Sequence, residues 1–379
     1  MRRSAFQFCH AVVLAVAFSA SVHAEESKDY VPKLGEFPPS KAGNYFAGEL
    51  VQVDHVNRRG ALRLVGDGLD DRYHSAPSHR FALLPYGTVS YHGAPAELRD
   101  IPIGTVLHGY FFLPPAGDDS IPPPEKNARY GLKYSHALSL EDDFSFYQRR
   151  ARSWQISAID LGKSECKVSA VGSDFTDGLK GEKTFTIDAS TRVWQGRQIA
   201  GLKALAEGQE VQLNLTWAPD WKNGQFHCAD IWVDKESGEV ASEVQRQIHL
   251  RHQLHRWLAG WVDHVEHLGA GKGIVTLTLF SGMDPTLYEQ ARKAKSSTLA
   301  AAEPTLRTWW QEHDGRSGTV LGFKDIVNPP AGSSGLQLRL EFSALLEGFR
   351  AGRIVRFRPD GFPKVKLPPE ERVQGMDQR

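Results

Sequence analysis

Cysteine is scarce in this chain, and neither sign of charge is in excess. Three cysteines in 379 residues are too few for a small disulfide-stabilised scaffold. The 45 basic residues balance the 45 acidic ones, so the chain lacks the overall field that attracts nucleic acid or anionic lipid. We therefore expect no nucleic-acid partner, and any charged binding site has to be a local feature.

The signatures of the common enzyme classes are missing as well. The sequence has no Gly-x-Ser-x-Gly elbow, no Walker loop and no Cys-x-x-Cys pair. The glycine-rich run 269–273 lies between two expected strands, which indicates a hairpin loop rather than a nucleotide-binding loop. The sequence thus identifies no catalytic residue, and we expect no cofactor.

One long apolar run is present, and it lies near the N-terminus. Arg2 and Arg3 precede the apolar residues 11–18, and small residues follow before the acidic pair 25–26. This pattern predicts a secretory signal peptide over 1–24; a retained N-terminal anchor is the alternative, although a spanning helix needs about 20 apolar residues. Without the signal peptide the chain has 43 basic and 45 acidic residues and no segment apolar enough to cross a membrane. We expect a periplasmic or secreted protein.

The rest of the chain repeats itself. Five spaced residues recur 104 positions later: Phe81, Val89, Leu98, Ile101 and Gly104 return as Phe185, Val193, Leu202, Leu205 and Gly208. A short alternating segment at 48–54 also returns at 154–160 and 260–266, a step of 106 residues each time. An apolar register that returns at one spacing predicts copies of one β-rich unit.

Each unit also closes with one motif. Leu98, Ile101 and Gly104 are three residues apart and precede an alternating strand, and the pattern recurs at 202–211 and 346–355. Apolar residues three apart share one face of a helical turn, and the glycine permits the positive φ that ends it. About five strands with one short helical turn is the plan of a small Greek-key barrel such as the OB-fold. An immunoglobulin-like sandwich would need about seven strands per unit.

We therefore predict a mainly β chain of three tandem small OB-like barrels, with a connecting helix and a helical insertion in the third. The expected order is a signal peptide (1–24), a flexible segment (25–44), barrel 1 (45–113), an extended proline-rich connector (114–150), barrel 2 (151–237), an amphipathic connecting helix (238–257), barrel 3 (258–362) and a loose tail (363–379). The insertion in barrel 3 covers 281–327. Asp284 before Pro285 predicts a helix over 286–302, and a hairpin is expected over 306–327.

Tryptophans provide the first candidate binding residues. Trp217 and Trp221 lie at the tip of an expected hairpin in barrel 2, and Trp309 and Trp310 lie in the insertion of barrel 3. An exposed indole can stack on a sugar or on a protein surface. Trp217 also continues the alternation of the strand before it, which favours an inward position that caps the barrel.

Two other pairs of residues are candidates for special roles. Arg356 and Arg358 line a closing strand, where they could contact a phosphate or an acidic glycan, or protect a sheet edge by their charge. Cys166 and Cys228 both fall in barrel 2, and an exported protein could join them by a disulfide. Two buried free thiols are the alternative.

Histidines cluster between barrels 2 and 3. On the expected helix, His249 and His255 are six residues apart and therefore point about 120° away from each other, with His252 between them. His264 and His267 are three apart in an expected strand and point to opposite faces. We expect no metal site, and we interpret the helical histidines as a solvated, mildly basic face.

The repeats resemble small exported bacterial OB-like β-barrel domains of unknown function, whose copies begin with Gly-x-Val-x-x-Val-Asp and close with Leu-x-x-Leu-x-x-Gly-x-x-Val. The shared positions are core residues and glycines, so the resemblance implies a fold and brings no catalytic residue. We expect a non-enzymatic exported protein that binds or organises an envelope component, either a glycan or a protein. The alternative is a hydrolase of an extracellular polymer that uses surface carboxylates such as Asp54, Glu97 or Glu266.

Overall fold

The computed structural model describes residues 29–65, 78–122, 133–172, 181–217, 226–301, 315–363 and 365. The predicted signal peptide and nearly all of the predicted tail lie outside these residues, as do Trp221, Trp309 and Trp310. Within the described part of the chain, no helix is long and apolar enough to cross a membrane.

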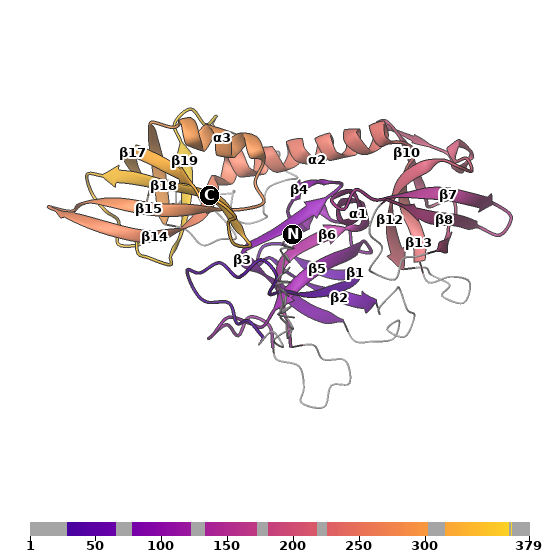
Figure 1. Cartoon of the computed structure of the whole chain (residues 1–379), viewed down its shortest axis with the longest axis horizontal. Coiled ribbons are helices and arrows are strands. Elements are labelled where there is room, and N and C mark those ends of the chain that lie inside the picture. Colours follow the sequence, from indigo (N-terminus) through magenta and orange to yellow (C-terminus); the bar gives the residue numbers. More distant parts are fainter. Residues whose placement is uncertain are drawn as a thin grey trace, which may run out of the picture.

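The chain is mainly β and forms three small closed barrels, as predicted. Figure 1 shows barrel 1, in indigo to magenta, between barrel 2 at one end and barrel 3, in orange and yellow, at the other. The helix α2 (Lys235–Arg256) runs from barrel 2 to barrel 3 and packs on β4 (Ala94–Ala96) of barrel 1 on its way. The extended connector predicted over 114–150 implies that barrel 1 is loosely attached to the other two. In the structure, α2 packs on barrel 1, which is held between its neighbours.

Barrel 1 follows the strand path of an OB-fold. Its other strands are β1 (Asn44–Asp54), β2 (Arg59–Val65), β3 (His79–Tyr91), β5 (Val106–Phe112) and β6 (His136–Asp142). They close in the order β1-β2-β3-β6-β5, and only the β3–β6 pair among these is parallel. The predicted end of barrel 1 at residue 113 is wrong, because the predicted connector supplies β6, whose Ala137 and Leu140 are fully buried in the core.

Barrel 2 repeats this path. The short helix α1 (Asp143–Gln148) follows β6 and leads into β7 (Ser153–Asp160), β8 (Glu165–Val171), β9 (Glu182–Thr186), β10 (Arg192–Gln195), β11 (Gln198–Ala200), β12 (Glu210–Trp217) and β13 (Phe226–Trp232). Strands β9 and β10 together take the place of β3, and both pair in parallel with β13. The connecting helix α2 begins at Lys235, three residues before its predicted start, because the Asp234 carboxylate caps it by accepting the N–H of Ser237 at 2.7 Å.

Barrel 3 is closed in a different way. Its elements are β14 (Leu258–Gly269), β15 (Lys272–Phe280), α3 (Pro285–Lys293), β16 (Ser296–Ala301), β17 (Arg316–Asp325), β18 (Ser333–Phe342) and β19 (Ile354–Pro359). The strand order is β14-β15-β18-β17-β16-β19, so the inserted β16 and β17 fill the gap that β6 and β13 fill in the other barrels. The predicted helix over 286–302 is wrong beyond Lys293, because residues 296–301 form the strand β16, which pairs antiparallel with β17. Most of the first arm of the hairpin predicted over 306–327 lies outside the described residues.

The three closing glycines occupy the same place in each barrel. The N–H groups of Gly104, Gly208 and Gly352 donate to the carbonyl oxygens of Leu50, Ile156 and Val262 at 2.7, 2.8 and 2.8 Å. Their φ values are +100°, +81° and +78°, in the region that glycine adopts without strain. The strand register also shifts just after each of the three acceptor residues. The same hydrogen bond and the same register shift occur at equivalent positions in each barrel. They confirm the prediction that the three barrels are copies of one unit.

The junction between barrels 1 and 3 is an aromatic cluster outside either barrel. Trp261 of β14 faces outward from barrel 3 and lies 5.1 Å, between ring centroids, from Tyr86 of β3. Phe37 of the N-terminal segment completes the cluster, 4.4 Å from the Trp261 ring and 5.3 Å from the Tyr86 ring. The predicted flexible segment over 25–44 is therefore wrong for residues 29–43, which this packing holds in place.

The junction between barrels 1 and 2 is polar and buried. The Asn214 side chain of β12 donates to the Asp142 carboxylate at 2.8 Å and accepts the N–H of Phe144 at 2.9 Å. The N–H of Leu215 donates to the Asp143 carboxylate at 2.9 Å. These bonds fasten the start of α1 to barrel 2, so all three barrels contact a neighbour through buried groups.

Cys166 of β8 and Cys228 of β13 are both free and buried in the core of barrel 2. The disulfide predicted between them is not formed. The structure instead shows the alternative prediction, two buried free thiols. Burial raises the pKa of Cys166 to about 11, and burial together with the neighbouring Cys166 raises the pKa of Cys228 well above its usual range.

We expect iodoacetamide at about pH 8 to leave both thiols of the folded protein unmodified, because each is buried and protonated. Unfolding in denaturant without a reductant should make both Cys166 and Cys228 reactive, as peptide mass spectrometry would show. Two cysteines that stay unmodified after unfolding, and react only after a reductant is added, would show that a disulfide exists.

Candidate functional site

Trp217 is not an exposed binding residue. It ends β12 with 6% of its surface exposed, and its ring packs 5.5 Å from that of Phe226 in the core of barrel 2. The guanidinium of Arg63, from barrel 1, lies 5.5 Å from the centre of the Trp217 ring. The inward position predicted from the alternation of the strand is thus confirmed, and Trp217 also contributes to the contact between barrels 1 and 2.

Arg356 and Arg358 lie on β19, which is paired with β14 on one side and β16 on the other. Because β19 has neighbours on both sides, the interpretation of these charges as edge protection is wrong. Arg358 is half-buried, and its guanidinium lies 5.6 Å from the centre of the Trp257 ring. Arg356 is only 4% exposed, and its Nη1 donates to the Trp257 carbonyl at 3.4 Å.

Two histidines of α2 are buried, so their interpretation as a solvated face is wrong. His252 is 1% exposed, and its Nε2 accepts a hydrogen bond from the Arg99 guanidinium of barrel 1. Burial, followed by the nearby charges of Arg99 and Arg256, lowers the pKa of His252 to about 3, so the ring is neutral. His249 is 2% exposed and faces a cavity. Among the described residues, no group of three or more His, Cys, Asp or Glu side chains is arranged to hold a metal ion.

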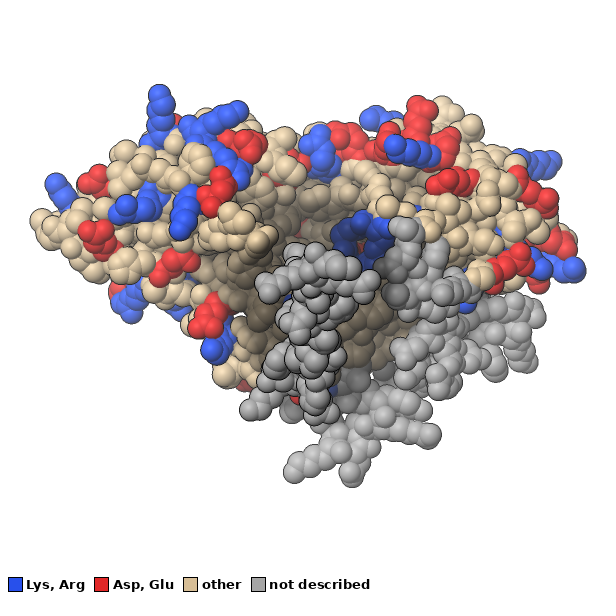
Figure 2. Space-filling model, in the orientation of Figure 1, with Lys and Arg blue, Asp and Glu red and all other residues tan. Residues whose placement is uncertain are grey.

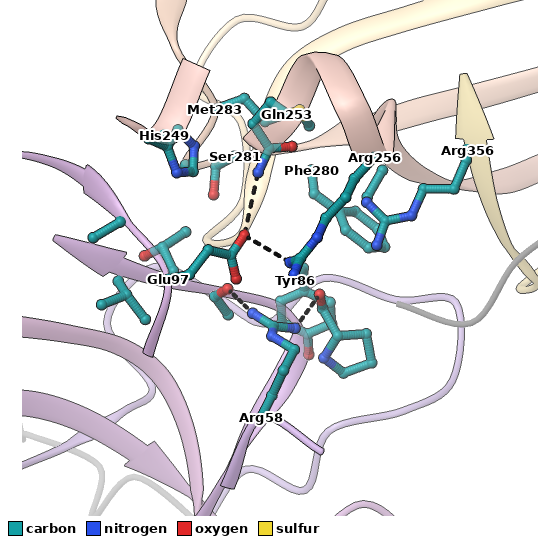
Figure 3. A pocket seen from close by; sticks show the side chains of 17 residues that line it. Arg58, Tyr86, Glu97, His249, Gln253, Arg256, Phe280, Ser281, Met283 and Arg356 are labelled. Atoms are coloured by element: carbon teal, nitrogen blue, oxygen red, sulfur yellow. Dashed lines mark hydrogen bonds and ion pairs between the residues drawn. The ribbon is translucent and has the colours of Figure 1, made fainter. Parts of the chain in front are cut away.

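A polar cavity of about 60 Å³ lies where barrel 1, α2 and barrel 3 meet. We call it the junction cavity, and Figure 3 shows its lining side chains. Its polar lining consists mainly of Arg58 and Glu97 from barrel 1, His249, Gln253 and Arg256 from α2, and Arg356 from barrel 3. The site therefore exists only when all three parts are assembled.

Arg58 is held in the wall by backbone groups. It follows the turn after β1 with a φ of +52°, and its guanidinium donates to the carbonyl oxygens of Leu84, Pro85 and Gly87 at 3.1, 3.0 and 2.6 Å. These carbonyls come from an irregular part of β3, where the register against β6 shifts between Leu83 and Thr88. Carbonyl oxygens orient the guanidinium but leave its positive charge uncompensated.

Glu97 supplies the negative charge of the wall. It precedes the 3₁₀ turn Leu98–Asp100, and its Oε1 lies 3.5 Å from Nη1 of Arg256 and 3.3 Å from Nε2 of Gln253. Burial alone would raise the pKa of Glu97, but the charges of Arg256 and Arg58 outweigh burial, and the pKa falls to about 2. The Glu97 carboxylate is therefore ionised throughout the physiological range.

The junction cavity has more positive than negative charge in its wall. Three arginines, Arg58, Arg256 and Arg356, line the cavity together with a single carboxylate, that of Glu97. His249 adds no charge, because burial lowers its pKa below the usual 6.5 even though Glu97 acts in the opposite direction. Neither His249 ring nitrogen makes a hydrogen bond of full geometry, and its weaker polar contact is with the backbone of Gly282. A buried imidazole beside an excess of guanidinium can donate to a bound anion.

The size of the cavity limits what enters it. A volume of about 60 Å³ suits roughly four water molecules, or one carboxylate or phosphate group. A wider groove of about 640 Å³ adjoins the cavity, because residues such as Thr88 and Gly282 line both. Tyr110, Ser139 and the ion pair of Glu141 with Arg149 line the groove, so it presents an aromatic ring, a hydroxyl and charged groups.

The three carboxylates considered for hydrolysis are not brought together. Asp54 accepts the side-chain amide of Asn57 at 2.7 Å within a turn, and Glu266 lies exposed 3.6 Å from Arg339. Glu97 is the only carboxylate among the described residues that line the junction cavity. Hydrolysis of a glycosidic bond by a pair of acids needs a second carboxyl group that carries a proton, and the described wall provides none.

The sequence indicates few of the residues in the cavity wall. It predicts a binding role for Arg356 alone, and it presents Glu97 as one of several surface acids. Arg58 and Arg256 carry no local signal, because single arginines in a turn and at the end of a helix are common. Their combination in one wall arises from contacts between residues up to about 300 positions apart.

On the face of the molecule that Figure 2 shows, both signs of charge are present on barrels 2 and 3. Figure 2 shows Lys and Arg side chains interspersed with Asp and Glu side chains over the visible faces of barrels 2 and 3. This mixture agrees with the balanced composition and makes the junction cavity a local electrostatic feature.

No protein-family model matches the chain, and neither a curated protein nor a solved structure matches it significantly, so its function has to be inferred from the geometry of this site.

Proposed function

We propose that this chain is an exported, non-enzymatic binding protein whose ligand is an acidic glycan of the cell envelope. Export rests on the signal peptide predicted over 1–24, and envelope localisation rests on the same pattern. The observation that carries the binding function is the junction cavity, whose wall holds three arginines and a buried histidine but a single carboxylate. The resemblance of the repeats to exported OB-like domains also supports the export that we propose.

The charge and size of the cavity support an anionic group as the part that is bound most tightly. Hydrogen bonds from guanidinium to carboxylate or phosphate are roughly twice as strong as those between neutral groups. The cavity admits one such group and excludes a whole sugar ring.

The adjoining groove supports a glycan rather than a peptide as the remainder of the ligand. Sugars bind to proteins by stacking on aromatic rings and by hydrogen bonds to charged and hydroxyl side chains, and the groove presents both kinds of group in Tyr110, Ser139 and Arg149. OB-folds commonly bind oligosaccharides or oligonucleotides, and the balanced charge of this chain disfavours a nucleic acid.

The test is calorimetric titration of the full chain with an oligogalacturonate and with the matched neutral oligogalactose. We expect binding of the acidic oligosaccharide only. Arg356→Gln should weaken that binding at least about tenfold, because it removes a charged donor from the cavity wall. Arg353→Gln is the matched control, since Arg353 lies exposed just before the same strand and should leave the affinity unchanged.

Equal binding of the two oligosaccharides would contradict the role given to the cavity. An unchanged affinity in Arg356→Gln would contradict it as well. Binding of an acidic peptide, with no binding of either oligosaccharide, would indicate that the ligand is a protein and not a glycan.

A further inference from the structure

A second group of reactive side chains lies outside the junction cavity, where β1, β5 and α1 meet. The phenol oxygen of Tyr45 lies 2.8 Å from Nδ1 of His108, and Nε2 of His108 lies 2.9 Å from Oδ1 of Asp143. The strand register explains the first contact, because Tyr45 faces Tyr110 and Ala47 faces His108 on the same outer face of barrel 1. None of these three residues lines the junction cavity.

The group becomes more buried from Tyr45 to Asp143. Tyr45 is 46% exposed, His108 is 4% exposed and Asp143 is 1% exposed. A reagent in solution can therefore reach part of the Tyr45 residue, whereas His108 and Asp143 behind it are shielded from water.

The two inner residues are held in one arrangement. Asp143 accepts the N–H of Leu215 at 2.9 Å through Oδ2, which leaves Oδ1 to accept the Nε2–H of His108. The His108 ring also stacks on Phe146 at 3.8 Å between centroids with 13° between the planes. With its proton on Nε2, His108 presents the lone pair of Nδ1 to the hydroxyl of Tyr45.

This order of groups matches the logic of a nucleophile, a base and an orienting carboxylate. The base removes the proton as the nucleophile attacks, and the carboxylate stabilises the imidazolium that forms. In the described part of the chain, Tyr45 supplies the hydroxyl, His108 the base and Asp143 the orienting carboxylate.

We propose that Tyr45 is an activated nucleophile that accepts an acyl group from an activated ester. A bond forms between the phenol oxygen of Tyr45 and the acyl carbon, the bond from that carbon to the leaving oxygen breaks, and the phenol proton passes to Nδ1 of His108. The products are an acylated tyrosine and a released phenolate, or an alcohol when the protonated His108 gives its proton to the leaving oxygen. The acylation proposed for Tyr45 does not depend on the proposed glycan binding, and the two proposals are tested by separate experiments.

The surroundings of Tyr45 favour an aromatic ester. The rings of Tyr110 and Phe146 each lie 5.8 Å from the Tyr45 ring, between centroids. The Arg150 guanidinium lies 3.4 Å from the centre of the Phe146 ring and donates to the Tyr110 hydroxyl at 3.2 Å. Phe146 is only 4% exposed and lies between His108 and Arg150, so an aryl ester would pack on the half-buried Tyr110 ring and the exposed part of Tyr45. The nearby positive charge of Arg150 favours the developing oxyanion.

The experiment uses p-nitrophenyl acetate with the full chain, and it follows both release of p-nitrophenolate and the mass of each tyrosine-containing peptide. We expect one acetyl group on Tyr45, added at least about tenfold faster than on Tyr110, which shares the same face but has no histidine base. Tyr45→Phe should abolish the fast phase, and Tyr134→Phe, at a tyrosine outside this group whose hydroxyl donates to Asp29, should leave it unchanged. Acetylation of Tyr45 no faster than that of Tyr110 would overturn the proposal without any variant.

Asp143 is a positioning residue. A variant of Asp143 tests the relay, by which we mean the hydrogen-bonded series of Tyr45, His108 and Asp143. Asp143→Asn should slow acetylation of Tyr45 by about 100-fold, because the imidazole loses its orienting carboxylate. The wild-type reaction should be slower in D₂O, and the variant should lose that isotope effect, which a purely structural role would not alter. If Asp143→Asn does not fold, His108→Gln replaces it, because glutamine can accept the hydrogen bond of Tyr45 but cannot take its proton. An unchanged rate in either folded variant contradicts the relay.

Discussion

Replacement of Trp261 by alanine is expected to lower the free energy of unfolding by about 3 to 5 kcal/mol. Trp261 is 2% exposed although it faces outward from barrel 3, because Phe37, Tyr86 and Phe280 surround it. Their ring centroids lie 4.4, 5.1 and 5.2 Å from that of Trp261. The substitution removes a large buried ring at the place where barrel 1, barrel 3 and the N-terminal segment meet, so a cavity remains that the three parts fill only partly.

Denaturant unfolding, followed by circular dichroism, measures this change. Phe323→Ala is the matched control, since Phe323 of β17 is 49% exposed and its truncation should change stability by no more than about 0.5 kcal/mol. We also expect Trp261→Ala to broaden the transition or divide it in two, because the cluster couples barrel 1 to barrel 3. A loss of no more than about 0.5 kcal/mol, as in the control, would show that the cluster does not join the barrels.

Replacement of Glu97 by glutamine is expected to cost about 3 to 5 kcal/mol at neutral pH, the range found when one partner of a buried ion pair is removed. Glu97 compensates Arg256 directly at 3.5 Å and opposes the charge of Arg58. Glutamine keeps the shape of the side chain and can still accept from Gln253, but it leaves both guanidinium groups without a negative charge in the described wall of the cavity.

The pH dependence of the same variant identifies the cause. Because the folded protein holds the pKa of Glu97 at about 2, below the usual 4.5, its ionisation stabilises the fold fully above about pH 4.5. This contribution is lost as the pH falls from there to about 2. The difference in unfolding free energy between the wild type and Glu97→Gln should therefore shrink over that interval.

Glu266→Gln is the matched control for the ion pair, since Glu266 and Arg339 are both about half exposed at 3.6 Å and their pair should contribute less than about 1 kcal/mol. A difference between wild type and Glu97→Gln that stays constant from pH 7 to pH 2 would show that loss of packing, not of charge, causes the destabilisation.

The candidate site could be predicted from the sequence only in fragments. Arg356 stood out because it lies in a run of spaced arginines, and His249 because it lies in a cluster of histidines. The sequence does not show that both face the same cavity as Glu97 and Arg58, since that depends on how barrel 3 packs against barrel 1. The sequence gives even less indication of the group formed by Tyr45, His108 and Asp143, because these residues come from two strands and a helix that are far apart in the chain.

The errors in the predicted fold have a common origin. The strand β6 lies beyond a proline-rich stretch that indicates an extended connector, yet Ala137 and Leu140 complete the core of barrel 1. Residues 296–301 continue a pattern that favours a helix, yet they form β16 because barrel 3 needs strands between β18 and β19. In both places the tertiary requirement to close a sheet overrode the local preference.

By itself the sequence determined that this protein is a series of three small β-barrels. Its alternating apolar residues and its repeated glycines, such as Gly104 and Gly208, act within a few residues and recur at a fixed spacing, so they can be read along the chain. Only the tertiary structure decided how the barrels pack, which strands close them and which charges meet in the junction cavity. Those features depend on contacts between residues far apart in the chain, and no local pattern encodes them.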